Sequence, residues 1–205
     1  APYGRLRAQN GPADRVMEVL KPVKVEKLGG GRYRVDFGET VSGWVRLHGV
    51  RGEAGRRIEI KYLSESPNGS NAYTMKGEGP EDYATRFTWY VFREVELSGW
   101  PGELHPGQLT AEAVYSDVET TGGFACSNPL LNRIDRIWWR TQLDNMHGAV
   151  ASDCPHRERS AYTGDGQVAC VTVMHNFDAA AFYSKWIRDI WGAQNVETGY
   201  VPNGA

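Results

Sequence analysis

The chain has 205 residues, enough for one large or two small domains with a sizeable buried core. Its 23 Lys and Arg against 25 Asp and Glu give a formal net charge of -2, and neither sign gathers in a block, so a nucleic-acid partner is excluded. The longest nearly apolar run, 168–174, is far shorter than the ~20 residues that a membrane-spanning helix needs, so we expect no membrane span.

The cysteines do not indicate whether the protein works in an oxidising or a reducing compartment. The chain has three cysteines, Cys126, Cys154 and Cys170, which cannot all pair with one another and are too few for a disulfide scaffold. Aromatic residues make up 11% of the chain, and 24 Gly with 10 Pro indicate many turns. The composition indicates a turn-rich globular protein, and we expect no cofactor.

Apolar and polar residues alternate from about residue 22 to residue 118, which is the period of a strand with one buried face. Turn residues interrupt this pattern repeatedly, and no helical pattern separates the runs, so we expect an antiparallel β-sandwich rather than a parallel sheet. The predicted strands are 33–37, 44–47, 58–62, 91–97 and 108–116, with a short strand at 72–76 inside a long loop.

After Gly122–Gly123 the apolar period changes from two to about 3.6, which indicates helices. The first helix is predicted to begin at a Ser127–Asn128 cap with Pro129 in its first turn and to end near His147–Gly148. A shorter helix follows at about 164–175, and Asp178 is predicted to cap a third.

The fold class is therefore mixed, β first and then α. No Pro- or Ser-rich linker marks the change of period, so we expect a β-sandwich domain at 1–120 packed directly against an α domain at 121–205. Cys126 and Cys170 are expected to be small buried residues. The tryptophans in apolar stripes are predicted to be core residues and the two outside them to be exposed; the first group is Trp44, Trp89, Trp138 and Trp186, and the second is Trp100 and Trp139.

The most unusual stretch is 153–165, DCPHRERSAYTGD, a polar loop between two apolar helices. It holds three carboxylates, two arginines, one histidine and one tyrosine, which indicates either an active site or a structural ion-pair loop. Cys154 and His156 match no standard zinc spacing, so we expect no metal. A Cys154 nucleophile with His156 as its base is also disfavoured, because Pro155 restricts the approach of the two side chains.

This loop resembles the signature loop of the α-L-rhamnosidases of glycoside hydrolase family 78, whose usual form is close to DCPQRxERLGWTGD, in some members without the extra residue before the Glu. Further likenesses run from about Arg15 to Ala205. The segments 35–38, 42–47 and 86–93 resemble strands of the β-sandwich that precedes the catalytic domain in that family, and 124–132 resembles the start of its first barrel helix.

The resemblance implies a catalytic (α/α)6 barrel, of which this chain holds the first helices, and inverting hydrolysis of terminal α-L-rhamnosides. It matches Glu158 to the general acid, Asp153 and Asp165 to carboxylates that bind sugar hydroxyls, Arg157 to a substrate-binding cation, and Tyr162 to the aromatic residue that lines the sugar pocket. The implied partner is a rhamnose-containing glycoside or polysaccharide.

Three departures from the family pattern leave the sugar preference open: His156 replaces Gln, Ser160–Ala161 replaces Leu-Gly, and Tyr162 replaces Trp. Inverting hydrolysis also needs a second carboxylate about 6.5–9.5 Å from the acid, to activate water. The resemblance implies that this base lies beyond Ala205. Because the chain also opens without Met and ends in a loop-like string, we expect a fragment that is inactive alone.

Two rival interpretations stay open. The chain could be a non-catalytic carbohydrate-binding or structural β-sandwich with a helical tail, or part of an (α/α)6-barrel glycosidase that acts on another sugar. The sequence leaves the aglycone, the oligomeric state and the compartment undetermined.

Overall fold

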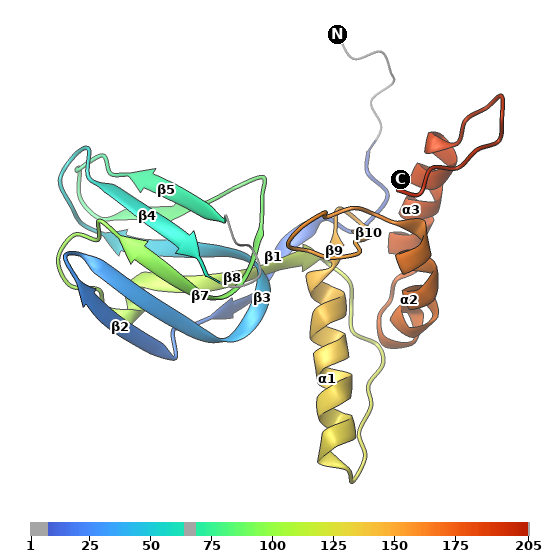
Figure 1. Ribbon diagram of the computed structural model, residues 1–205, viewed down its shortest axis with the longest axis horizontal. Coiled ribbons are helices and arrows are strands. Elements are labelled where there is room, and N and C mark those ends of the chain that lie inside the picture. The colour runs from blue at the N-terminus through green and yellow to red at the C-terminus, as the bar shows by residue number, and fades with distance from the viewer. Residues whose placement is uncertain (1–7, 64–68, 205) are drawn as a thin grey trace. The chain divides into compact units, whose positions relative to one another are not determined.

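The computed structural model describes residues 8–63 and 69–204, which fall into two compact units (Figure 1). The sandwich unit contains 16–115 together with one short segment from far along the chain, Pro155–Glu158. The helical unit contains the described residues up to 15, then 116–154 and 159–204.

The sandwich unit is built on antiparallel strand pairs. The strands follow the order β1-β8-β3-β7-β4-β5, and β2 and β6 also pair with β3. Their bounds are β1 Asp14–Leu20, β2 Lys24–Gly29, β3 Arg32–Val50, β4 Arg57–Tyr62, β5 Ser70–Thr74, β6 Glu81–Ala84, β7 Tyr90–Ser98 and β8 Leu109–Ser116, with a 3-10 turn at Pro106–Gln108. The predicted order, an antiparallel sandwich followed by helices, is confirmed.

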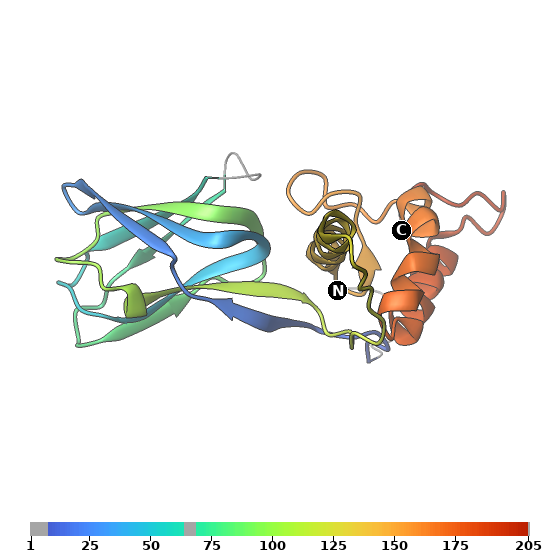
Figure 2. The ribbon, with the colours of Figure 1, turned by 90° about the horizontal axis from the view of Figure 1, so that it is seen from below.

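Strand β3 is the hub of the sandwich because it pairs with β2, β6, β7 and β8. Its register with β7 shifts between Asp36 and Val41, next to Gly38, whose φ of 84° favours glycine. Such an irregularity bends a strand, and the sheet curls back on itself (Figure 2). At Gly43 the neighbouring strand approaches so closely that a Cβ would lie 1.9 Å from the Glu112 carbonyl oxygen.

The core of the sandwich comes from the alternation that the sequence shows. In β4 the residues alternate strictly between exposed and buried, so Ile58, Ile60 and Tyr62 face inward. Each apolar side chain of this size contributes roughly 1.5–3 kcal/mol when fully buried. The other fully enclosed residues include Val35, Val45, Leu47, Phe92, Val95, Leu97 and Leu109.

Trp100 corrects the prediction that it is exposed, since it is only 1% accessible. Gly99 adopts a φ of 72°, and this left-handed turn carries the chain back after β7. The Trp100 backbone N–H then donates to the Gly31 carbonyl at 3.0 Å, and Arg56 donates to the Trp100 carbonyl. Strand periodicity does not extend into a turn, so the pattern did not reveal this burial.

The helical unit contains α1 Pro129–Asp144, the short strands β9 Met146–His147 and β10 Val150–Ala151, α2 Thr163–Asn176 and α3 Ala180–Ala193 (Figure 1). As predicted, Asn128 caps α1: its side chain accepts a hydrogen bond from the Leu130 N–H at 2.9 Å. Among the described residues, no helix has both the length and the apolar character needed to cross a membrane.

Three local predictions in the helical half were wrong. Helix α1 ends at Asp144, and the β9–β10 hairpin takes up the residues after it. Asp178 does not cap α3, because Ala179 holds the cap position and the Asp178 N–H donates to the Glu119 carbonyl. Cys126 is exposed rather than buried.

Helices α2 and α3 lie side by side in both views (Figures 1 and 2), and a glycine allows the contact. A Cβ on Gly166 would lie 2.0 Å from Cη2 of Trp186, so only a residue without a side chain fits there. Trp186 is buried at this contact, and Phe182 of the same helix is buried as well, as the apolar stripe of α3 predicts. The apolar stripe of α1 is different, since Leu130, Ile134 and Ile137 are exposed in this structure.

Of the other stripe tryptophans, Trp44, Trp89 and Trp138 are half-buried rather than fully enclosed. Two of them carry hydrogen bonds through the indole: Trp44 donates to Glu112 at 2.6 Å, and Trp89 donates to the Pro155 carbonyl at 2.9 Å. A tryptophan in an apolar stripe can thus hold polar groups at the edge of the core.

Candidate functional site

The base of the loop is a two-residue hairpin between α1 and the loop itself. His147 pairs with Val150, and the turn residues Gly148 and Ala149 both have left-handed φ values, 64° and 55°. The Gly148 N–H donates to both carboxylate oxygens of Asp14, at 2.8 and 3.0 Å. Ser116 completes this network by donating to Asp14 at 2.9 Å and accepting from the Ala149 N–H.

A hollow of about 470 Å³ opens in the helical unit between the end of α1, the hairpin and the start of α2. Two of the predicted site residues, Asp153 and Asp165, line it from opposite ends of the loop. The remaining lining residues are Gln142, Asn145, Ala151, Ser152, Gly164, Val168 and Ala169. A hollow with a few converging polar groups is suited to a small polar ligand.

Asp153 is held by the loop that it begins. Its N–H donates to the Ser160 carbonyl at 3.1 Å, and its carboxylate accepts from the Ser160 N–H at 3.3 Å and from the Cys154 thiol at 3.2 Å. The Arg159 N–H donates to the Cys154 carbonyl, with Arg159 in the left-handed region at a φ of 55°. These bonds join Asp153 and Cys154 to Arg159 and Ser160 across the loop, and they fix the Asp153 carboxylate.

Asp165 and Tyr162 stand at the other end of the loop, where α2 begins. Asp165 lies in the first turn of α2, where the helix dipole stabilises a carboxylate. Tyr162 precedes the helix, forms an isolated bridge with Gly204 and is 36% exposed. An aromatic ring at this degree of exposure can cover an apolar face of a ligand.

Glu158 and Arg157 lie in the short segment that belongs to the sandwich unit. The Arg157 Nη2 lies 3.0 Å from Oε1 of Glu158 and 3.1 Å from Oε2, and both side chains are exposed to solvent. The predicted acid and the predicted substrate-binding cation therefore form an ion pair.

Sequence reasoning missed the groups that α1 and the hairpin supply to the hollow. Gln142 is buried despite its polar side chain, and Asn145 binds the Ser152 hydroxyl through its side-chain oxygen at 3.0 Å. A signal was present, because the polar residues Gln142, Asp144 and Asn145 interrupt the apolar pattern at the end of α1. Buried polar groups of this kind generally serve a network or a ligand.

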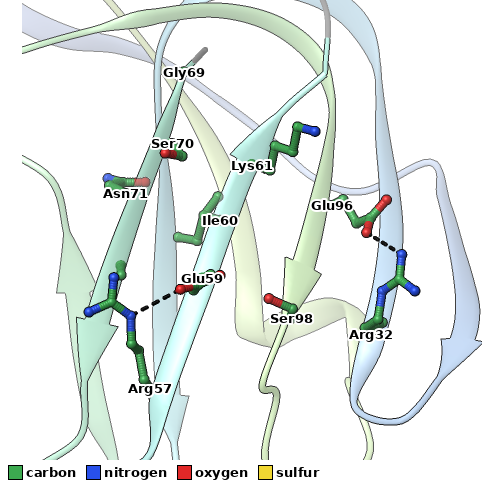
Figure 3. A pocket seen from close by; sticks show the side chains of 11 residues that line it. Arg32, Arg57, Glu59, Ile60, Lys61, Gly69, Ser70, Asn71, Glu96 and Ser98 are labelled. Carbon is green, nitrogen blue, oxygen red and sulfur yellow. Dashed lines mark hydrogen bonds and ion pairs between the residues drawn. The ribbon is translucent and has the colours of Figure 1, made fainter. Parts of the chain in front are cut away.

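A larger hollow of about 700 Å³ lies on the sandwich unit and offers a rival location (Figure 3). Four of its charged lining residues pair with one another: Arg32 pairs with Glu96 at 2.6 Å and Arg57 with Glu59 at 3.0 Å. The Arg32 hydrogen bond holds the pKa of Glu96 below its ordinary value. None of the described lining residues is aromatic, so this surface lacks the stacking platform typical of a sugar site.

Two family models match the chain. The bacterial α-L-rhamnosidase six-hairpin glycosidase domain matches residues 119–205, and the bacterial α-L-rhamnosidase concanavalin-like domain matches residues 65–115.

Curated relatives carry the name α-L-rhamnosidase. One from Formosa agariphila is 31% identical over 203 residues, and one from Streptomyces avermitilis is 30% identical over 206 residues. These matches cover 90% and 93% of this chain but only 21% and 20% of the relatives. The chain thus spans about a fifth of the length of these proteins.

Solved structures give the same picture. The α-L-rhamnosidase from Dictyoglumus thermophilum has a TM-score of 0.91 at 32% identity, covering 98% of this chain and 24% of that one. The α-L-rhamnosidase of Streptomyces avermitilis complexed with L-rhamnose has a TM-score of 0.87 at 30% identity, covering 97% of this chain and 20% of that one. Both halves of the chain are therefore similar to proteins of one kind.

Proposed function

Because the chain belongs to the α-L-rhamnosidases of glycoside hydrolase family 78, we propose that it forms part of an enzyme that releases terminal α-L-rhamnose from rhamnosides with inversion. One observation within the chain carries this proposal: Asp153 and Asp165 reach one hollow from opposite ends of the signature-like loop. We also propose a domain boundary near residue 120.

In this proposal the two aspartates bind sugar hydroxyls. A carboxylate accepts hydrogen bonds and can hold two hydroxyls of a ring at once. The bonds from Ser160 and Cys154 fix the Asp153 carboxylate before substrate arrives. Preorganisation of this kind lowers the entropy that binding must otherwise overcome.

Glu158 is the proposed general acid, which must hold a proton when it meets the oxygen of the leaving group. The Arg157 guanidinium contacts both oxygens of this carboxylate, at 3.0 and 3.1 Å, and so occupies the atoms that must meet the leaving oxygen. Arg157 must therefore leave Glu158 in the productive complex. We propose that Arg157 turns to the substrate, because its side chain is exposed to solvent and has room to move.

The test is the substitution Glu158→Gln in the full-length enzyme that carries this chain. General acid catalysis contributes roughly 10²–10⁴-fold, so turnover of an alkyl α-L-rhamnoside should fall by at least about 100-fold. An aryl rhamnoside with a good leaving group needs less protonation and should be affected much less. Glu197→Gln is the control, because Glu197 is also an exposed glutamate but lies outside the loop 153–165.

Near-normal turnover of the alkyl rhamnoside by the Glu158→Gln enzyme would refute the assignment of the acid. Aryl glycosides of other sugars should be assayed beside the rhamnoside, since His156 and Tyr162 differ from the family pattern. Faster hydrolysis of another sugar would favour the rival glycosidase and would leave the proposed acid intact.

A further inference from the structure

The segment Pro155–Glu158 belongs to the sandwich unit, although its neighbours on both sides, Cys154 and Arg159, belong to the helical unit. A hydrogen bond from the Arg159 N–H to the Cys154 carbonyl closes the turn at its neck. The four residues at the tip of the turn, Glu158 among them, are thus positioned by contacts with the sandwich.

One of these contacts is a defined hydrogen bond. The indole N–H of Trp89 donates to the Pro155 carbonyl at 2.9 Å, in a part-buried position and across 66 positions of sequence. Proline has a fixed φ, so holding its carbonyl restricts the orientation of the following peptide as well. The bond therefore acts on the backbone that leads to Glu158.

Trp89 is itself attached to a rigid part of the sandwich. It directly precedes β7, which pairs with both β3 and β4. The next residue, Tyr90, stacks on the buried Tyr62 with ring centroids 4.0 Å apart and pairs with Gly43 of β3. A donor fixed in this way can hold a loop, whereas a donor on a mobile segment would move with it.

We propose that Trp89 is a positioning residue for the general acid: its indole anchors the Pro155 carbonyl and so sets where the Glu158 carboxyl stands. This inference rests on the proposed role of Glu158. It gives the sandwich a part in catalysis although none of its strands carries a proposed catalytic residue. A displacement of about 1 Å at a catalytic group can cost up to about 100-fold in rate.

The test substitutes Trp89→Phe in the full-length enzyme, which keeps an aromatic ring and removes the donor. We expect kcat on an alkyl α-L-rhamnoside to fall about tenfold with KM nearly unchanged, because binding groups elsewhere are untouched. On an aryl rhamnoside with a good leaving group, kcat should change by less than about threefold. Loss of folded enzyme would lower kcat on both substrates by the same factor, so the ratio of the two is the diagnostic readout.

Trp44→Phe is the matched control. The Trp44 indole also donates from the sandwich unit, to Glu112 at 2.6 Å, and is likewise half-buried. Its removal should leave the ratio of alkyl to aryl turnover unchanged. If Trp89→Phe folds poorly, β-(3-benzothienyl)alanine placed at position 89 keeps the bicyclic shape and replaces only the N–H by sulfur.

A double variant separates the two proposals. If Trp89 acts through Glu158, Trp89→Phe should add little to the loss already caused by Glu158→Gln. Full activity of Glu158→Gln would sink the proposed acid, and the inference about Trp89 with it. The inference about Trp89 alone would be overturned by a different pair of results. In that case Glu158→Gln strongly reduces alkyl rhamnoside turnover, whereas the Trp89→Phe or benzothienyl enzyme keeps the normal ratio of alkyl to aryl turnover.

Discussion

Tyr162 sets the start of α2 through its backbone and leaves its ring partly exposed. Its N–H donates to the Ser160 carbonyl and its carbonyl accepts from Gly166, so the backbone starts α2 while the ring stays 36% exposed. We predict that Tyr162→Ala in the full-length enzyme raises KM for a rhamnoside at least about tenfold, because in our proposal the ring covers apolar C–H groups of the sugar. Tyr162→Trp should be tolerated. Steady-state kinetics on one aryl rhamnoside measure both.

The control for this prediction is Tyr200→Ala, since Tyr200 is a more exposed tyrosine of the same unit and lies outside the loop 153–165. Unchanged kinetics for Tyr162→Ala would place the ring outside the substrate contacts. They would also weaken the transfer of the family's aromatic position to this chain.

Between elements, the contact of α2 with α3 depends on Gly166. We predict that Gly166→Ala lowers the melting temperature of the helical domain in the full-length protein. The new methyl group would press on the buried Trp186 ring, and overpacking costs about 1–3 kcal/mol. Alanine recovers at most about 1 kcal/mol through its higher helix propensity, so the clash should dominate.

Gly164→Ala on the same helix is the matched control for stability. Apart from its chain neighbours and the backbone of its own helix, no atom lies within 4 Å of a Cβ placed there, so only helix propensity acts and the melting temperature should stay the same or rise. Equal melting temperatures for Gly166→Ala and wild type would show that the contact between α2 and α3 accommodates the methyl group without a loss of stability.

Strands β3 and β7 are joined by an ion pair that makes the sandwich sensitive to acid. Arg93 donates two hydrogen bonds of 2.8 Å to the Asp36 carboxylate, and this contact holds the pKa of Asp36 below its ordinary value of 3.8. The folded state then binds this proton more weakly than the unfolded state. The stability that Asp36 contributes is fully present above the unfolded value and is lost as the pH falls through the folded pKa.

We therefore predict that Asp36→Asn reduces the loss of stability between about pH 6 and about pH 3, measured as the shift in the urea midpoint by tryptophan fluorescence. Glu96→Gln should act in the same direction, because the Arg32 hydrogen bond also lowers the pKa of Glu96. If the urea midpoint of the double variant Asp36→Asn, Glu96→Gln falls on acidification by as much as that of wild type, neither ion pair contributes to acid sensitivity.

At the scale of the whole molecule, exposed apolar side chains favour association of the chain in water. Residues of all three helices are exposed over more than half of their surface, among them Leu130, Ile134, Val171, Ile187 and Trp191. We predict that the 205-residue chain by itself associates, binds hydrophobic dyes and shows no rhamnosidase activity. Limited proteolysis should leave a resistant sandwich core that ends near residues 118 to 125.

A monomeric, protease-resistant 205-residue species that hydrolyses an aryl rhamnoside would contradict this prediction. It would show that the exposed stripes are harmless in water and that the chain holds its own base. Sedimentation and a mass map of the proteolytic fragments decide the structural part, and an activity assay on the same sample decides the catalytic part.

Local patterns in the sequence were sufficient for the order of elements. Alternation over 58–62 predicts the inward residues of β4, and the Asn128–Pro129 pair predicts the start of α1, because both signals act within a few residues. The loop 153–165 was also recognisable, since a dense cluster of charges between apolar helices is rare by itself. The roles proposed for its residues remain predictions.

Contacts across long stretches of sequence decided the rest. Nothing near Trp100 reveals that Gly99 turns it into the core, and nothing near Gly148 reveals that Asp14 holds the hairpin. The bond from Trp89 to Pro155 joins segments with unrelated local patterns. The sequence by itself determined which residues alternate, cap and turn, whereas the tertiary structure alone decided which distant groups meet, because periodicity reports burial but carries no information about the partner.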